Sequence, residues 1–228
     1  MVLSATTTLT RSAQSHSRPM RILFNPTLTF ALLFVGCDSV QSLQKPLPNG
    51  TFAMQIVARH EVDDNIIELA EVPEGTTIRD GENVVARWLP LWPGSPAEND
   101  SAAVKELVVR ESANGKEMLL LTNAFDVTEK HIVGTHYVSP VQGDNLVYVW
   151  LSDDGGRNAR QLSASVLAGN NTNSPGRVAM IVRGQVYSVS EVDNVVSGQI
   201  AIRTGSVTDG QKIESILLGA NAKTTNTE

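Results

Sequence analysis

The sequence contains a single cysteine in 228 residues, so no disulfide can form within one copy of the chain. The fold must therefore stand on its hydrophobic core alone. The sequence also lacks the short motifs of common enzyme sites, namely the glycine-rich dinucleotide fingerprint, the P-loop, His-Glu-x-x-His and Gly-x-Ser-x-Gly. We therefore predict no catalytic, cofactor-binding or metal-binding residue, and we expect a protein that is not an enzyme.

Histidines and acidic pairs with metal-ligand spacing are also scarce. His131 and His136 lie five residues apart, which leaves them off a common helix face, and neither has a cysteine or aspartate at ligand spacing. The pair Asp153-Asp154 before Gly155 has a superficial likeness to a calcium loop, but the further acidic ligands and the closing glutamate are missing. We interpret the acidic pair as the cap of a helix.

Basic residues are outnumbered, with 18 Lys and Arg against 24 Asp and Glu. The only charges in residues 1–36 are Arg11, Arg18 and Arg21, so the rest of the chain carries a net charge of −9. Binding to a phosphate backbone needs clustered Lys and Arg, so a nucleic-acid partner is excluded. A hydrophobic content of 41% with 18% charged residues is typical of a chain that folds around a core.

No apolar run reaches the roughly 20 residues that a membrane-spanning helix needs. Arg21 opens a shorter apolar segment that Asn25-Pro26 interrupts and that ends at Gly36-Cys37, which is the pattern of a secretory signal. Phe34-Val35-Gly36-Cys37 resembles the lipobox of bacterial lipoproteins, although leucine is usual in place of Phe34. We predict a signal peptide over 1–36, with Met20 as an alternative start, and lipidation of Cys37. The alternative is an ordinary signal peptide that contains a chance cysteine.

Composition then divides the rest of the chain. Residues 37–50 are rich in Gln, Ser and Pro and predict a flexible tether. We expect a small α+β unit over 51–100, a larger α+β domain over 103–221 and a disordered tail over 222–228. Three prolines between Pro90 and Asp100 suggest the boundary between the two units.

The strongest strand pattern lies in residues 177–205. Two apolar, β-branched runs flank Arg183-Gly184, where a glycine supplies the positive φ of a tight hairpin. Ile200 and Ile202 alternate with polar residues in the strand that follows. Asn114-Gly115 predicts a second hairpin, between strands 104–110 and 116–122. Similar patterns predict strands over 51–59, 84–89 and 146–151.

Helices are expected in four places among these strands. They are a short helix to Ala70 opened by Asp63-Asp64, a short helix from Thr128 to Val133, a long one from Asp153 closed by Gly169, and a last one with a capping box at Thr208–Gln211, closed by Gly219. Strands in hairpins mixed with helices predict an α+β fold, with antiparallel sheets covered on one face by helices.

Several of these segments together resemble SecD, a subunit of the bacterial protein-export translocase. The hairpin and Ile-rich strand of 177–205 are similar to a corresponding region of that family. So are the segment 123–128, the strand and helix of 146–163, and the helix of 207–220. The range 52–70 resembles the opening strand and helix of SecD proteins from planctomycete-like bacteria. The resemblance covers most of 51–221, with departures at Glu129, where the family has glycine, and at Ser188-Val189-Ser190, where it has Ser-Ala-Pro.

The resemblance implies the periplasmic head subdomain of SecD, a ferredoxin-like α+β module that assists export of unfolded polypeptide. In that family the proton-coupling residue lies in membrane helices, which have no counterpart among the segments that match here, so the resemblance does not carry over the motor function. Together with the lipobox-like sequence at Cys37, it predicts a stand-alone, lipid-anchored head on the periplasmic face of a membrane in the cell envelope. The expected partners are extended or unfolded polypeptide, or components of the Sec translocase.

Two other functions stay open at this point. One is a scaffold or interaction lipoprotein unrelated to export. The other is a cryptic hydrolase, which would need a deep pocket that gathers Asp126, Glu129 and His131. The tryptophans Trp88, Trp92 and Trp150 add one more question, because a strand tryptophan usually packs in the core but can also line a peptide groove.

Overall fold

The structure is a computed structural model that describes residues 41–43, 45–60, 62–71, 75–99, 107–139, 144–169 and 175–219. These residues belong to one compact unit, Asp38–Glu228. The predicted signal peptide, Cys37 and the tail 222–228 lie outside the described residues.

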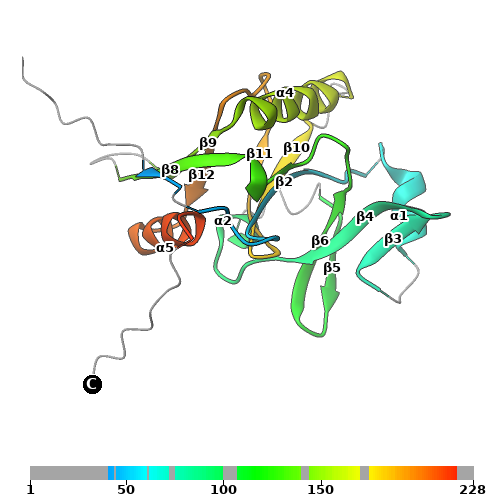
Figure 1. Cartoon of the computed structure of the whole chain (residues 1–228). Helices are drawn as coiled ribbons and strands as arrows, with labels where there is room; N and C mark the ends of the chain where they lie inside the picture. Colours follow the sequence, from blue (N-terminus) through cyan, green and yellow to red (C-terminus); the bar gives the residue numbers. More distant parts are fainter. Residues whose placement is uncertain are drawn as a thin grey trace, which may run out of the picture. The chain divides into compact units, whose positions relative to one another are not determined.

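The described elements are strands and helices that alternate along the chain (Figure 1). The strands are β1 (Gln41–Ser42), β2 (Phe52–Val57), β3 (Thr77–Asp80), β4 (Asn83–Pro90), β5 (Val109–Ser112), β6 (Gly115–Leu121), β7 (Val127–Thr128), β8 (Ile132–Val138), β9 (Asn145–Leu151), β10 (Arg177–Val182), β11 (Gln185–Glu191) and β12 (Gln199–Thr204). The helices are α1 (Asp64–Ala70), α2 (Pro96–Asn99), the 3-10 turn η1 (Glu129–His131), α4 (Asp153–Ala168) and α5 (Val207–Leu217).

The strands form two antiparallel sheets. The larger sheet has the order β11-β10-β2-β6-β4-β3, with β5 added on β6 and β7 on β2, and the smaller sheet has the order β1-β8-β9-β12. Helix α4 packs on β2, β7 and β9, whereas α5 packs on β8, β9 and β12 (Figure 1). The predicted α+β class with antiparallel sheets is confirmed.

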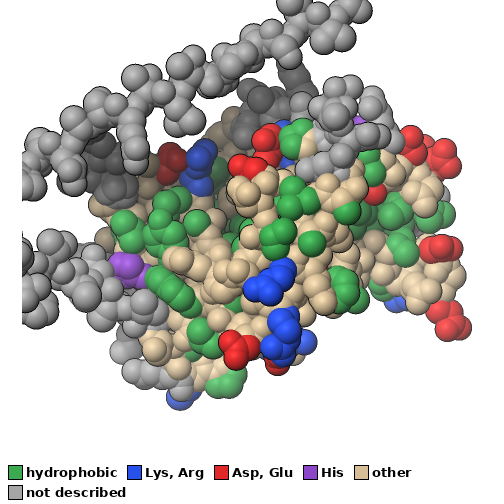
Figure 2. Space-filling view, turned by 90° about the horizontal axis from the view of Figure 1, so that it is seen from above, with side chains coloured by type: hydrophobic (Ala, Val, Ile, Leu, Met, Phe, Trp, Pro, Cys, Tyr) green, Lys and Arg blue, Asp and Glu red, His purple; other side chains and the backbone are tan. Residues whose placement is uncertain are grey.

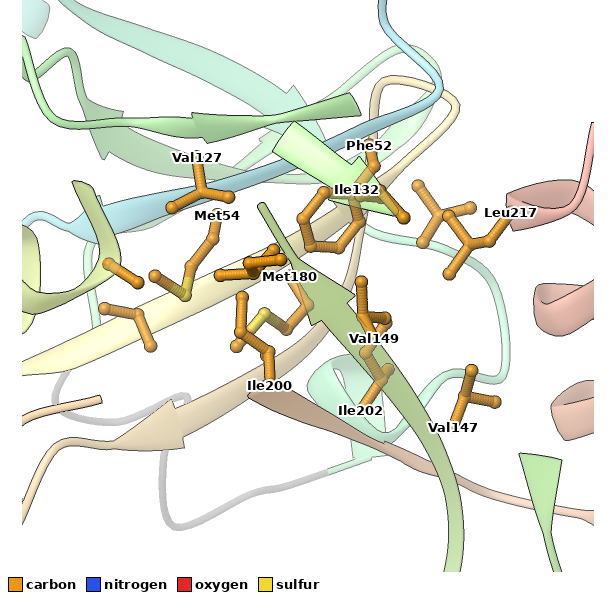
Figure 3. Packing of buried hydrophobic residues seen from close by; sticks show 14 of the residues in the cluster. Phe52, Met54, Val127, Ile132, Val147, Val149, Met180, Ile200, Ile202 and Leu217 are labelled. Carbon is orange, nitrogen blue, oxygen red and sulfur yellow. The ribbon is translucent and has the colours of Figure 1, made fainter. Parts of the chain in front are cut away.

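The main core fills the space between the two sheets and these helices. Val147 and Val149 of β9 and Ile200 and Ile202 of β12 meet Met180 of the larger sheet there (Figure 3). The alternation of β12 predicted this side of the core, because its Ile residues are buried and its Gln199, Ala201 and Arg203 are exposed. Period-two patterning thus decides which face of the smaller sheet packs inward.

Strand β10 is buried on both faces, unlike a strand with one solvent face. Val178, Met180 and Val182 belong to the main core, whereas Ala179 and Ile181 face a second cluster with Leu120 and Val186. A continuous apolar run is the pattern of such a strand. This double burial makes β10 the most enclosed strand of the described part.

Both predicted hairpins form. Arg183 and Gly184 have φ values of 51° and 74°, which is the pair of positive φ angles that a two-residue type I′ turn requires. Gly115 follows the turn between β5 and β6 with a φ of 109°. Glycine adopts such φ values without steric strain, which explains its presence at positions 115 and 184.

Two helices start at a serine that the sequence analysis did not select. Ser152 caps α4 by accepting from the Gly155 N–H, so Asp153 and Asp154 lie in the first turn and not before it. Ser206 caps α5 by accepting from the Asp209 N–H, so the predicted capping box at Thr208 is wrong. In both cases the serine hydroxyl satisfies a free amide three residues further on, in the first turn.

The short helix predicted from Thr128 to Val133 forms only in its first part, as the 3-10 turn η1 with Thr128 as its N-cap, and its predicted end is wrong because β8 begins at Ile132. Gly134 weakens the strand pattern of this segment. The strand forms because β8 pairs with β1 on one side and with β9 on the other, which the local sequence does not predict. Strand β3, which the sequence analysis also missed, is stabilised in the same way by pairing with β4.

Part of the predicted tether packs on the body. Gln41 and Ser42 pair with β8, and Leu47 is buried in the main core. An apolar residue in a Pro-rich stretch can be buried once a neighbouring edge strand holds it in place.

The two ranges expected as separate units share the larger sheet, because β2 pairs with β10 from the second range.

Candidate functional site

A groove of about 540 Å³ lies between the edge strand β11 of the larger sheet and the edge strand β12 of the smaller sheet. Most of its lining side chains are short. The lining residues are Pro96, Ala97, Leu146, Arg177, Ser188, Val189, Ser190, Glu191, Asp193, Ala201 and Arg203. Short side chains allow a second backbone to come close to both strands.

Among the described residues, the outer edge of β11 pairs with another segment at one end only, and helix α2 also packs against this strand. Leu91 forms a parallel bridge with Val186, and the Trp92 N–H donates to the Val186 carbonyl over 2.9 Å. Beyond this bridge, no described strand pairs with the outer side of Ser188–Glu191. The register with β10 shifts between Met180 and Ile181, so a bulge separates the covered end from the open end.

The outer edge of β12 is open along its length in the described part of the chain, since β9 is its one sheet partner there. The Gly198 carbonyl accepts from the Leu151 N–H over 2.9 Å, just before β12 begins. Hydrogen-bonded pairs alternate along an antiparallel ladder, so the peptide groups of Gln199, Ala201 and Arg203 point away from β9. Ala201 and Arg203 are also the β12 residues that line the groove.

Ser188 leaves an unsatisfied hydroxyl in this groove. Its side chain is 2% exposed, and its Oγ has no hydrogen-bond partner among the described residues. A buried polar group without a partner has a free-energy cost, which a bound hydrogen-bonding group would remove.

The charges of the groove are balanced. Arg177 and Glu191 face each other across β10 and β11 and form an ion pair of 2.8 Å. Arg203 pairs with Asp144 over 2.9 Å at the exposed end, and Asp193 lies nearby in the lining. Two basic and two acidic lining residues give the groove no net charge, so it suits a neutral backbone better than a strongly charged ligand.

The residues proposed for a hydrolase do not gather in one cavity of the described part. Glu129 lines a separate hollow with Leu43 and Leu47. His131 is buried, and its Nδ1 accepts from the Thr128 N–H over 3.0 Å, so this ring nitrogen is already used. Burial also lowers the pKa of His131, and the nearby Lys130 adds to this effect. His131 therefore has a structural role in the turn.

Asp126 has its own set of partners. Its Oδ2 accepts from the Gln55 side-chain amide over 2.6 Å and from the Asn123 N–H over 3.3 Å. Burial raises the pKa of Asp126 to about 6, while these hydrogen bonds and the charge of Arg87 limit the rise. No nucleophile or base lies among these partners, so the cluster ties the loop before β7 to β2.

The three tryptophans occupy three different surroundings. Trp92 packs edge-on against Tyr187 at 5.5 Å between ring centroids, and Trp150 lies next to Tyr148 on the smaller sheet. Trp88 is 5% exposed and lines a cavity of its own. They therefore do not form one shared peptide groove. The groove described above was missed because its walls, β11 and β12, are consecutive strands that belong to different sheets.

The described residues include no cluster of His, Cys, Asp and Glu that could hold a metal ion. Asp154 pairs with Arg157 on the surface of α4. None of the helices in the described ranges combines the length and the apolar character needed to cross a bilayer. On the side seen in Figure 2, acidic and basic side chains are interspersed with apolar ones and form no broad patch of one sign.

Comparison with known proteins gives distant likenesses only. No family model matches the chain, and no curated protein matches it. Among solved structures, one described as SecDF in super-membrane-facing form is 16% identical with a TM-score of 0.40, and the match covers 76% of this chain but 19% of that one. Another, described as a membrane component SecDF that enhances protein export, is 14% identical with a TM-score of 0.37 and covers 75% and 93%. Likenesses this distant carry no functional argument, so the function proposed below rests on this chain's own residues and geometry.

Proposed function

We propose that this chain is an exported, lipid-anchored domain that binds extended polypeptide without catalysis, in the groove between β11 and β12. The observation that carries the proposal is the pair of open strand edges facing one groove with short side chains. An extended chain can add a strand to such an edge through backbone hydrogen bonds, a mode that tolerates many sequences. The unsatisfied Ser188 hydroxyl offers one further contact.

The setting that we propose is the periplasmic face of a membrane, with a link to protein export and to the Sec translocase. It is supported by the resemblance of residues 51–221 to the SecD head and by the secretory pattern that ends at Cys37. A polypeptide that crosses a membrane is extended and carries unsatisfied backbone groups, which is the ligand that two open edges fit. Binding of a folded envelope protein in its place would favour a scaffold function.

We expect the chain from Gln41 to Glu228 to bind permanently unfolded model substrates weakly. The affinity should lie in the micromolar range or poorer, about −8 kcal/mol at best. The net charge of −9 beyond residue 36 should favour basic substrates, and added salt should weaken that preference. Fluorescence titration of labelled substrates at two salt concentrations measures both effects.

The variant Ala201→Pro tests whether the substrate binds to the edge of β12. Proline removes the outward N–H and is tolerated on an edge strand, so the variant should fold while its affinity falls about tenfold. Ala201→Thr keeps the N–H and favours a strand, and it should bind like the wild type. Equal affinity of the two variants would remove β12 from the site. Absence of any binding up to millimolar substrate, together with firm capture of a folded envelope protein, would replace the proposal by the scaffold function.

A separate measurement tests the anchor at Cys37. Metabolic labelling with a fatty-acid analogue should mark the wild type and leave Cys37→Ser unlabelled, because a lipobox cysteine is the site of acylation. The wild type should sediment with membranes, and the variant should do so much less. Equal labelling of both proteins, or a wild type found outside the membrane fraction, would contradict the lipoprotein assignment without touching the groove.

A further inference from the structure

A second cavity, of about 790 Å³, shares no lining residue with the groove. It lies where α1, β4 and the β5–β6 hairpin meet, and Figure 1 shows α1 beside β3 and β4. This volume is within the range of small-ligand sites in proteins.

Trp88 of β4 lines the cavity, and its indole N–H is a buried hydrogen-bond donor. The side chain is 5% exposed, and its Nε1 has no hydrogen-bond partner among the described residues. The Arg110 guanidinium lies 4.4 Å from the ring centroid, so one face of the indole is already occupied. A buried indole N–H normally finds an acceptor, which makes this one a position for an acceptor of a bound molecule.

The walls around Trp88 are apolar. Ile67 and Ala70 of α1 stand on one side, and Val108 stands on the other, just before β5. These side chains pack with Trp88 in a small cluster that is separate from the main core. They fit a bulky apolar group.

The mouth of the cavity is acidic. Glu71 and Glu111 are exposed and line it, and the charge of Arg110 is balanced by Glu117 at 2.8 Å. The Arg110 side chain also donates to the Gly75 carbonyl over 3.2 Å, which holds it in place above the indole. The two carboxylates at the mouth therefore favour a cationic group on the ligand.

We infer that this cavity binds a bulky apolar side chain of a polypeptide that has a basic residue next to it. The apolar side chain would fill the space beside Trp88, a backbone carbonyl would accept from its Nε1, and the basic residue would meet Glu71 and Glu111. This site is independent of the groove between β11 and β12, since the lining residues differ. It adds a sequence preference that backbone pairing at a strand edge does not supply.

The probes are acetyl-Phe-Lys-amide, acetyl-Phe-Glu-amide and acetyl-Ala-Lys-amide, titrated into the full chain while the Trp88 indole N–H resonance is followed by NMR. Trp88→Phe assigns the resonance by its loss. The Phe-Lys probe should shift it with saturation, the Phe-Glu probe should bind about threefold more weakly, and the Ala-Lys probe should give no saturable shift. In Trp88→Phe the affinity for the Phe-Lys probe should fall about fivefold. Because this variant lacks the indole N–H, its affinity is measured from other resonances that the probe shifts.

Two further variants make the outcome decisive. Glu71→Gln combined with Glu111→Gln should equalise the Phe-Lys and Phe-Glu affinities. Ala113→Trp, at an exposed turn position beside the mouth, should block both probes and leave the fold intact. Ala201→Pro should leave these shifts unchanged, so the cavity can be supported even where the groove fails. A resonance that no probe moves, or equal affinities of Phe-Lys and Phe-Glu in the wild type, would overturn the inference.

Discussion

Met180→Asp is expected to prevent folding. Met180 is 3% exposed and packs between the two sheets, beside Ile200 and Val149 (Figure 3). A carboxylate there has no described polar partner on its face of β10, and burying such a group costs several kcal/mol. The whole domain is stable by about 5–15 kcal/mol, so this one change removes much of the margin.

Thermal unfolding followed by circular dichroism tests this expectation with two matched variants. Met180→Leu keeps the volume and should cost less than about 1.5 kcal/mol. Val133→Asp adds the same charge at a side chain that is 47% exposed on β8, and it should change stability by less than about 0.5 kcal/mol. A cooperatively folded Met180→Asp protein with the melting temperature of the wild type would refute the placement of β10 in the core.

Local signals explain why much of the fold could be predicted from the sequence. The hairpins at Asn114-Gly115 and Arg183-Gly184 require glycine for backbone reasons that hold in any fold. Ala159, Leu162, Val166 and Leu167 have helical spacing that predicts the buried face of α4 in the same way, and the first three are buried while Leu167 is half-buried. Each of these features depends on residues a few positions apart.

The features that were missed depend on partners far away in the sequence. Strand β8 needs β1 and β9 to complete its ladders, and Leu47 is buried only because β1 holds the preceding residues on the smaller sheet. Ser152 was passed over because Asp153 and Asp154 follow it, and Ser206 because Thr208 is also a good cap residue.

The candidate site was hidden for a different reason, because its two walls are close in sequence but belong to different sheets. Ser188 and Ala201 belong to strands in different sheets, and nothing in the sequence says that their outer edges face one groove. The one local hint is the pair Ser188 and Ser190, which follows the buried Val186 and Tyr187 in β11. By contrast, Asp126, Glu129 and His131 are close in sequence, yet η1 and β7 direct them to different surroundings.

The first turn of α4 holds two adjacent glycines with different neighbours. A Cβ atom on Gly155 would lie 2.6 Å from the His131 Cβ and 3.1 Å from the His131 carbonyl oxygen. His131 cannot easily move away, because its carbonyl accepts from the Ser152 N–H over 2.8 Å and its Nδ1 accepts from the Thr128 N–H. On Gly156 the nearest atom would be the Gly198 backbone nitrogen at 3.3 Å, so Gly198 would need to move by only a few tenths of an ångström.

Gly155→Ala should therefore destabilise the protein by about 2–3 kcal/mol, even though alanine favours a helix over glycine by up to about 1 kcal/mol. Gly156→Ala receives the same helix preference without a rigid clash, and its stability should stay within about 0.5 kcal/mol of the wild type or rise above it. Urea unfolding of both variants measures the difference under identical conditions. Equal stabilities would mean that α4 does not start against η1 as described. A lower urea midpoint for Gly155→Ala alone would show that the first turn of α4 lies in close contact with His131. Glycine is needed at position 155 because that contact leaves no room for a side chain.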